Sequence, residues 1–157
     1  FKHRGIFIMP IMAVKAANTS RTSTATLAND SELVIAIPEG GQYEIEVFLQ
    51  FYGGAGGFAR ALTYDGTTHA DGINVGGQQH VNGTGAVLAV IDGTDSVASA
   101  TITAADPGDY HRLVGSAHFT TSGNLRVQWA QNSSNASATT LKAGSFIRAR
   151  KLASATS

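Results

Sequence analysis

Cysteine is absent from the sequence, and charged residues make up only 14% of its 157 positions. A chain of this length buries about 70% of the surface that its unfolded form exposes, so one domain of this size folds without disulfides or structural metals. The 11 basic and 11 acidic residues balance, whereas binding to nucleic acid or to anionic membranes starts from clustered Lys and Arg. We therefore expect no nucleic acid among the partners and no insertion into a membrane.

Small residues are abundant instead, including 18 glycines, and they favour short strands joined by turns over long helices. The clearest strand is Gln42 to Tyr52, where the odd-numbered side chains are apolar and most even-numbered ones are polar. Such a period of two places one face on a core and the other against water or a neighbour. Phe48 and Tyr52 are aromatic residues on the polar face, which makes them a candidate subunit interface.

The same pattern predicts further strands along the chain. They are Ser20–Leu27, Glu32–Ile37, Phe58–Tyr64, Ala86–Ile91, Val97–Thr103, Tyr110–Thr120, Leu125–Ala130 and Thr139–Leu152. The glycines from Gly53 to Gly57 predict a hairpin between the Gln42–Tyr52 strand and its successor. About eight strands at this spacing, without an amphipathic helix, indicate an all-β fold, an antiparallel sandwich or barrel, and a jelly roll is the first choice. Trp129 shares one face of its predicted strand with Leu125 and Val127, and it belongs to the predicted core.

The N-terminal residues 1–17 read as an extended arm ahead of a domain at 18–152 and a short tail at 153–157. The apolar side chains of the arm are candidates for contact with a neighbouring subunit: Phe1, Ile6, Phe7, Ile8, Met9, Ile11 and Met12. Basic residues followed by apolar ones resemble a signal peptide, but Pro10 interrupts the apolar run, which is also too short to span a bilayer. A first strand of the domain itself explains the same pattern equally well.

Motifs that carry chemistry are missing, so we expect a protein that is not an enzyme and that holds no metal or cofactor. The five histidines match no metal-binding or catalytic pattern. Asp65 to Thr84 is expected to be a long surface loop, in which four polar residues are candidates for binding a receptor: His69, Asp71, Gln78 and His80. A metal site built from this loop is the weaker alternative, because the spacing fits no known ligand set.

Several stretches of the sequence resemble the small virion proteins of tailed bacteriophages. They are Asn18–Leu27, Asp30–Val34, the strand that contains Tyr43, Leu125–Ala136 with Leu141, and Ala143–Ala149. The resemblance runs from about Lys15 to Leu152 and is weak in the glycine-rich middle. It implies a β-sandwich that assembles as a homotrimer and serves in the virion as a minor tail, tail-fibre, head-fibre or capsid decoration protein.

Two functions of different class follow from that resemblance. The first is a non-catalytic capsid decoration or head-fibre protein that binds the major capsid protein or other virion subunits on the outer capsid surface. Arg148 and Arg150, on one face of the last predicted strand, are then candidates for contact with an acidic patch. The alternative is a tail-fibre tip whose loops recognise a host surface glycan. The short chain has no repeat that suggests a fibre shaft, which favours the first function.

Overall fold

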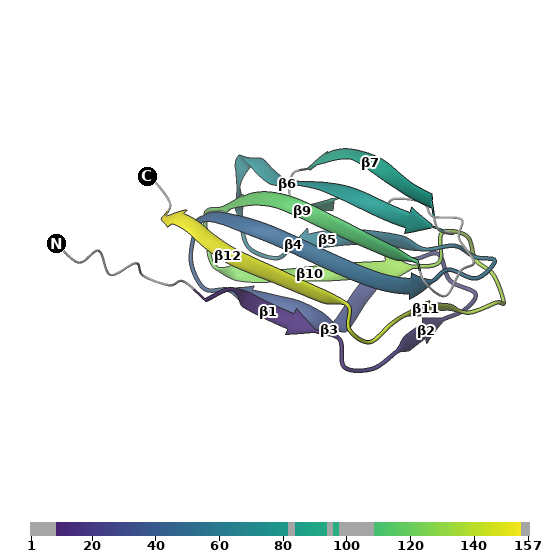
Figure 1. Ribbon diagram of the computed structural model, residues 1–157. Helices are drawn as coiled ribbons and strands as arrows, with labels where there is room; N and C mark the ends of the chain where they lie inside the picture. The colour runs from purple at the N-terminus through teal and green to yellow at the C-terminus, as the bar shows by residue number, and fades with distance from the viewer. Residues whose placement is uncertain (1–8, 82–83, 94–95, 98–108, 155–157) are drawn as a thin grey trace.

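The computed structural model describes residues 9–81, 84–93, 96–97 and 109–154, which form strands and no helix (Figure 1). The strands are β1 (Ile11–Val14), β2 (Thr19–Arg21), β3 (Ala28–Ile37), β4 (Gly41–Tyr52), β5 (Ala59–Tyr64), β6 (Thr68–Val81), β7 (Thr84–Gly93), β8 (Ser96–Val97), β9 (Tyr110–Phe119), β10 (Gly123–Ala130), β11 (Thr139–Leu141) and β12 (Phe146–Ser154). The described part of the chain therefore contains no helix that is long and apolar enough to cross a membrane.

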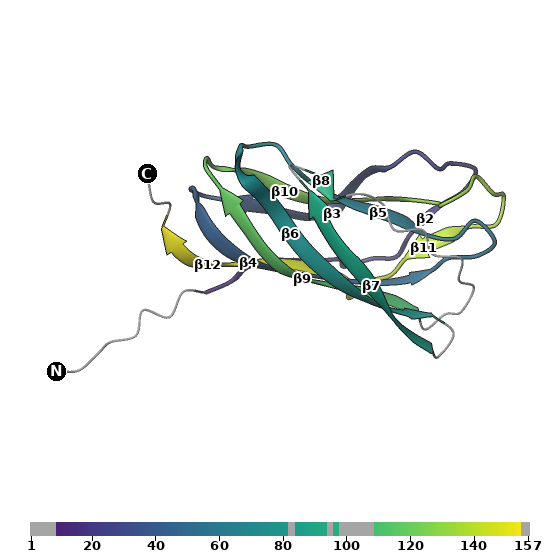
Figure 2. The same cartoon turned by 90° about the horizontal axis from the view of Figure 1, so that it is seen from above.

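Two antiparallel sheets lie face to face (Figure 2). The larger sheet has the order β1-β12-β4-β9-β6-β7, with the short β2 and β11 joined beside β4, and the smaller sheet has the order β3-β10-β5-β8. The four strands β1-β12-β4-β9 of the larger sheet face the four strands β3-β10-β5-β8 of the smaller one. The chain crosses repeatedly from one set to the other, in the order of a jelly roll. A hairpin of β6 and β7 is inserted between β5 and β8 and widens the larger sheet. The predicted fold class is confirmed.

The core lies between the sheets and follows the alternation that the sequence shows. The inward side chains of β4 are at most 1% exposed: Tyr43, Ile45, Val47, Leu49 and Phe51. An aromatic stack crosses from one sheet to the other, because Phe51 and Phe58 lie 4.3 Å apart between ring centroids and Phe58 and Trp129 lie 5.9 Å apart. Each buried side chain of this size contributes about 1.5–3 kcal/mol, so the core dominates the stability of the sandwich. The prediction that Trp129 is a core residue is confirmed.

The expected hairpin between residues 42–52 and 58–64 is wrong. β4 pairs with β12 and β9 in the larger sheet, whereas β5 pairs with β10 and β8 in the smaller one. The glycine-rich turn at 53–57 carries the chain from one sheet to the other. Gly54 and Gly57 have φ values of 52° and 65°, a left-handed backbone that glycine adopts without steric cost. Glycine clustering marks the turn but does not say whether the two strands pair.

The expected long loop at residues 65–84 is also wrong, because most of this segment is the strand β6. It pairs with β9 on one side and with β7 on the other, with register shifts between Thr68 and Ile73 and between Val75 and Gly77. The glycines of β6 do not break the ladder, since main-chain hydrogen bonds form it. The close approach of β6 and β9 does require a glycine at Gly115 of β9. A Cβ added there would lie 2.0 Å from the carbonyl oxygen of Asn74 on β6.

The N-terminal segment joins the sandwich from Ile11 onward. β1 pairs with β12, and Ile11 and Ala13 pack against the core, as the alternative of a first strand requires. Met9 is 75% exposed and precedes that strand. The arm residues Phe1, Ile6, Phe7 and Ile8 lie outside the described residues.

Two cations fasten the chain after β1 to the smaller sheet. Lys15 is buried and forms ion pairs with Asp30 and Glu32 of β3. Arg21 lies 4.2 Å over the ring of Trp129 and donates hydrogen bonds to the carbonyl oxygens of Ala28, Asn29 and Trp129. Asp30 belongs to β3, and its carboxylate accepts hydrogen bonds from the backbone N–H groups of Glu32 and Leu33.

Candidate functional site

The outer face of the larger sheet is the face directed away from the smaller sheet, and no described element covers it (Figures 1 and 2). Even-numbered residues of β1, β4, β9 and β12 project there, because their odd-numbered neighbours are buried in the core. The strand registers place these side chains in rows across the sheet. One row contains Val14, Phe146, Phe48 and Arg112, and the next contains Met12, Arg148, Glu46 and Val114.

Phe48 stands at the centre of an aromatic group on this face. Its ring centroid lies 5.7 Å from that of Phe146 on β12 and 5.3 Å from that of Tyr110 on β9. Rings at these separations attract each other and form a rigid apolar surface. Exposed aliphatic side chains continue it, with Met12 at 49%, Val14 at 51% and Val114 at 42% exposure.

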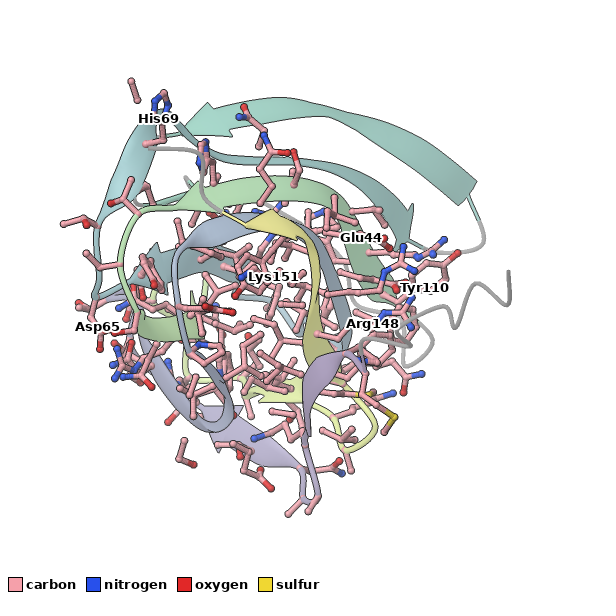
Figure 3. All side chains as sticks on the ribbon, turned by 90° about the vertical axis from the view of Figure 1, so that its left-hand side faces the viewer. Glu44, Asp65, His69, Tyr110, Arg148 and Lys151 are labelled. Carbon is pink, nitrogen blue, oxygen red and sulfur yellow. The ribbon has the colours of Figure 1, made fainter. Side chains whose placement is uncertain are left out.

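Charged residues lie beside the aromatic group and neutralise one another within the same face. Glu46 is 5% exposed and lies between two guanidinium groups, with Arg112 Nε at 2.8 Å from its Oε1 and Arg148 on its other oxygen. Glu44 pairs with Arg150 in the neighbouring row. Figure 3 shows Glu44, Tyr110 and Arg148 on the same side of the sandwich. The face is therefore apolar at its centre and has no strong field of one sign.

The opposite face, on the smaller sheet, is different. Asp65 accepts hydrogen bonds from the backbone and side chain of Asn124 and pairs with Arg126 at 2.6 Å. The hydrogen bonds from Asn124, followed by those from Arg126, lower the pKa of Asp65 to about 2. Figure 3 shows Asp65 on the far side of the molecule from Tyr110 and Arg148. Polar side chains on β10 alternate with its buried ones, so this face meets water as an ordinary sheet surface does.

A shallow hollow lies on the outer face at the end of the sheet where β12 finishes. Its lining comes from four strands: Gln42, Gly72, Asn74, Ser116, Ala117, His118 and Leu152. The ring of His69 stacks on that of His118, with centroids 4.7 Å apart and planes 15° from parallel. No group of three or more metal-ligating side chains occurs among the described residues. The hollow thus combines polar and apolar groups, with one imidazole stack beside it.

Comparisons with known proteins find distant likenesses of fold. No protein-family model and no curated protein matches the sequence. Among solved structures, the chain is similar to Eiger TNF from S. frugiperda (11% identity, 96% of each chain, TM-score 0.45) and to murine APRIL (9% identity, 91% of this chain and 98% of the other, TM-score 0.46). It is also similar to the carbohydrate-binding module CBM6cm-2 from Cellvibrio mixtus lichenase 5A (15% identity, 92% and 98%, TM-score 0.30). Identities this low concern the fold alone.

The two residues predicted as a subunit interface lie at different places on the outer face. Phe48 is partly buried by the rings beside it. Tyr52 is 37% exposed at the end of β4, where its backbone pairs with Thr140 of β11. Met12, predicted to contact a neighbour as part of the arm, shares the outer face, whereas Ile11 points toward the core.

The four residues predicted to bind a receptor do not form one site in a loop. His69, Asp71, Gln78 and His80 all belong to β6, and Gln78 and His80 pair in register with Arg112 and Tyr110 of β9. His69 lies near the other end of β9, against His118. His69 and His80 lie near opposite ends of this extended 14-residue strand, so they cannot converge on one ligand.

Phe146 and Tyr110 belong to the aromatic group but were not among the predicted site residues. Phe146 has the same parity as Arg148 and Arg150, and Tyr110 the same parity as Arg112, so alternation alone places each on the outer face. Arg148 and Arg150, expected to meet an acidic patch on another subunit, pair with Glu46 and Glu44 of the same chain. Only the strand order brings those carboxylates beside them.

Proposed function

We propose that this protein is a non-catalytic structural subunit of a phage virion that associates with copies of itself through the outer face of the larger sheet. The observation that carries the proposal is the group of Phe48, Phe146 and Tyr110 on a face that no described element covers. Contiguous apolar side chains of this kind mark sites of protein association. Aromatic residues and arginine are also the residue types enriched where proteins bind each other.

A second copy of this chain suits the outer face better than a strongly charged partner does. The arginines of the face already have carboxylate partners beside them, and the whole chain has no net charge. Electrostatic attraction to nucleic acid or to an acidic protein needs unpaired charge of one sign. Copies that meet through such a face close into a ring, and the sequence resemblance favours a homotrimer among the closed symmetries.

The self-association is tested by native mass spectrometry and by light scattering of the purified protein. The wild type is expected to be a homotrimer. Phe48→Glu places a charge at the centre of the aromatic group and should weaken association at least about tenfold, as loss of a central contact does. Ala36→Glu, exposed on the smaller sheet, is the matched control and should leave the trimer unchanged. A wild type that stays monomeric at high concentration contradicts the proposal.

Within the virion we propose a place on the outer capsid surface, as a decoration protein that reinforces the shell. The support is the sequence resemblance, together with an N-terminal segment that precedes β1 at the edge of the larger sheet. Three copies that each hold a shell subunit share their binding energy, and the assembled capsid is stabilised by mass action.

Rebinding to capsids that lack the protein tests this role. Wild-type protein should bind such capsids to saturation and raise the temperature at which they release DNA. A variant without residues 1–8 keeps β1 and should bind more weakly, because the segment supplies apolar contacts. If wild-type protein does not bind, the decoration role is wrong, whereas the self-association result stands independently.

A receptor-binding tail-fibre tip is the second candidate, and the hollow beside the histidine stack favours it. Amide, hydroxyl and imidazole groups of Gln42, Ser116 and His118 line this hollow with an apolar Leu152. A few convergent polar groups over apolar surface are typical of small-ligand sites. Saturable binding on a glycan array, abolished in His118→Ala but retained in Phe48→Glu, would support this candidate over decoration.

A further inference from the structure

Lys15 is buried beside the core, with its ammonium group between two carboxylates. Its Nζ lies 2.8 Å from Oδ2 of Asp30 and 2.8 Å from Oε2 of Glu32. The side chains of Lys15 and Asp30 are 0% and 2% exposed, and that of Glu32 is 30% exposed. Ions removed from water to this extent carry a desolvation cost that their mutual attraction only partly offsets.

Hydrogen-bond donors hold both oxygens of the Asp30 carboxyl group. Oδ1 accepts from the backbone N–H of Glu32 at 3.0 Å and from that of Leu33 at 3.1 Å. Oδ2 accepts from the indole N–H of Trp129 at 3.1 Å as well as from Lys15. Two backbone donors on one oxygen are the arrangement that stabilises the oxyanion of an acyl-transfer reaction. The carboxyl carbon is thereby fixed and polarised next to a primary amine.

We propose that Lys15 and Asp30 condense into an intramolecular isopeptide bond, with Glu32 as the catalytic residue that moves the protons. The bond forms between Nζ of Lys15 and Cγ of Asp30, and the bond between Cγ and Oδ2 breaks. Oδ2 leaves as water. This modification goes beyond the proposed function and does not depend on it.

The reaction starts from the ion pair. Burial raises the pKa of Asp30, but hydrogen bonds from Lys15, the Glu32 backbone and Trp129 outweigh burial and leave this pKa below its usual value. Asp30 is therefore ionised in the ion pair and cannot react in that form. Glu32 has to relay a proton from Nζ to Oδ2, which yields a neutral amine and a neutral acid. The contact of Glu32 with Nζ is within the distance at which general acid–base catalysis operates.

The remaining steps balance in atoms and charge. Nζ attacks Cγ, and the negative charge that develops on Oδ1 faces the N–H groups of Glu32 and Leu33. Glu32 then takes a second proton from Nζ and gives it to the Oδ2 hydroxyl group, which departs as water when the carbonyl reforms. Of the three hydrogens on the ammonium group, one stays on the amide and two leave in water. Glu32 returns to its carboxylate form, and no oxidant or reductant is required.

Burial favours the product as well as the reaction. The fold holds the amine of Lys15 beside the carboxyl group of Asp30, so the two groups do not have to meet by diffusion. Such intramolecular reactions are much faster than the reaction of the same groups free in water. A neutral amide also removes two charges from a site that solvates them poorly. Exclusion of water from Lys15 and Asp30 protects the amide from hydrolysis.

A second ion pair in the chain shows whether a short distance between an amine and a carboxylate is sufficient for condensation without burial. Lys151 Nζ lies 2.6 Å from Oε1 of Glu39, which is closer than the Lys15 contacts, but the Glu39 side chain is 65% exposed. Water solvates the Glu39 carboxylate there, and no pair of backbone donors on this carboxyl group occurs among the hydrogen bonds described. We expect no condensation at this pair.

Mass spectrometry of the denatured wild-type protein tests the proposal without any variant. The intact chain should be lighter than its sequence mass by one water molecule. Trypsin should fail to cut after Lys15 and should release residues 5–21 joined to residues 22–60 as one species. A chain of full mass that releases residues 16–21 as a separate peptide overturns the proposal, and so does a water loss without the joined species.

Variants then assign the roles. Lys15→Arg keeps the charge but cannot form the amide, so its mass should be that of the unmodified chain. Glu32→Gln keeps an oxygen for the backbone N–H of Ala16 but cannot relay protons, so the joined species should fall at least tenfold in a fixed incubation. Lys151→Arg should leave the joined species at the wild-type level. A Glu32→Gln protein that is as fully joined as the wild type overturns the role of Glu32.

Discussion

Arg60 donates a hydrogen bond from Nε to Nδ1 of His111 at 3.0 Å, and neither residue is exposed to solvent. Arg60 comes from β5 and His111 from β9, so the pair joins the two sheets through the core. Burial, and after it the charge of Arg60, lowers the pKa of His111 to about 3. Burial also lowers the pKa of Arg60 to about 10. The imidazole is therefore neutral and accepts the bond, because a protonated ring nitrogen has no lone pair to offer.

The first prediction concerns the dependence of stability on pH. The unfolded chain protonates His111 near the ordinary pKa of 6.5, whereas the folded chain does so only near 3, so unfolding takes up a proton between these values. The free energy of unfolding should thus fall as the pH falls from about 6.5 to about 4.5, and a shift of this size is worth on the order of a few kcal/mol in total. Urea titrations across this range measure it.

His111→Gln removes the titration and keeps an acceptor for Arg60, so its unfolding free energy should vary less over the same range. Asp30 and Asp65 have lowered pKa values, and their contributions are lost only in more acidic solution. A slope in the variant as steep as in the wild type would show that His111 is not the group responsible.

The second prediction compares two glycines of the larger sheet. An added Cβ at Gly115 would lie 2.0 Å from the carbonyl oxygen of Asn74, whereas at Gly76 it would meet nothing within 4 Å. Gly115→Ala should therefore lower the free energy of unfolding by about 1–3 kcal/mol or more, because β6 and β9 must separate. Gly76→Ala should change it by less than about 0.5 kcal/mol. Equal effects in urea titrations would contradict the close approach of these strands.

The third prediction concerns the guanidinium group of Arg21. It donates to carbonyl oxygens of Ala28, Asn29 and Trp129 and covers the Trp129 ring. Lysine cannot reproduce this fork of planar donors, so Arg21→Lys should cost about 1–3 kcal/mol in thermal or urea unfolding. Arg126→Lys alters a pair that is open to solvent and should cost less than about 1 kcal/mol.

The fourth prediction concerns the neutrality of the outer face. Glu46 is the shared partner of Arg112 and Arg148, and Glu46→Gln leaves these two cations beside each other without a counter-charge. If copies of the chain meet through this face, the variant should associate more weakly by about 1–2 kcal/mol and should recover in high salt, which screens the repulsion. Light scattering at two salt concentrations measures it. Salt-independent association equal to that of the wild type would place the interface elsewhere.

Sequence alternation predicted the inward and outward residues of single strands but not the sheet to which each strand belongs. Trp129 and the odd-numbered residues of β4 were found because a half-buried strand shows its period in the sequence. The hairpin of β4 with β5 was wrong because a glycine-rich turn permits either pairing or a crossover. β6 was missed because its sequence is rich in glycine and polar residues, so that its buried side chains Ile73 and Val75 form too short an alternation to stand out.

The same limit applies to the outer face. Phe48 was predicted from its own strand, whereas its partners Phe146 and Tyr110 lie on β12 and β9, about 98 and 62 positions away along the chain. Parity places each of them on the outer face, but only the strand order makes them neighbours. The contact of Lys15 with Asp30 and Glu32 has the same origin, since it depends on how the segment after β1 passes over β3.

β1 and β12 lie antiparallel, with Ile11 opposite Ala149, so the chain enters β1 and leaves β12 at the same end of the sandwich. A force that pulls these two ends apart acts across the ladder and opens its hydrogen bonds one after another, which is the weakest way to load a sheet. Lys15 follows β1 directly and is anchored in β3 of the other sheet. Peeling of β1 therefore stops after its four residues. Further force then acts on the buried contacts of Lys15 with β3, and no longer on the hydrogen bonds between β1 and β12.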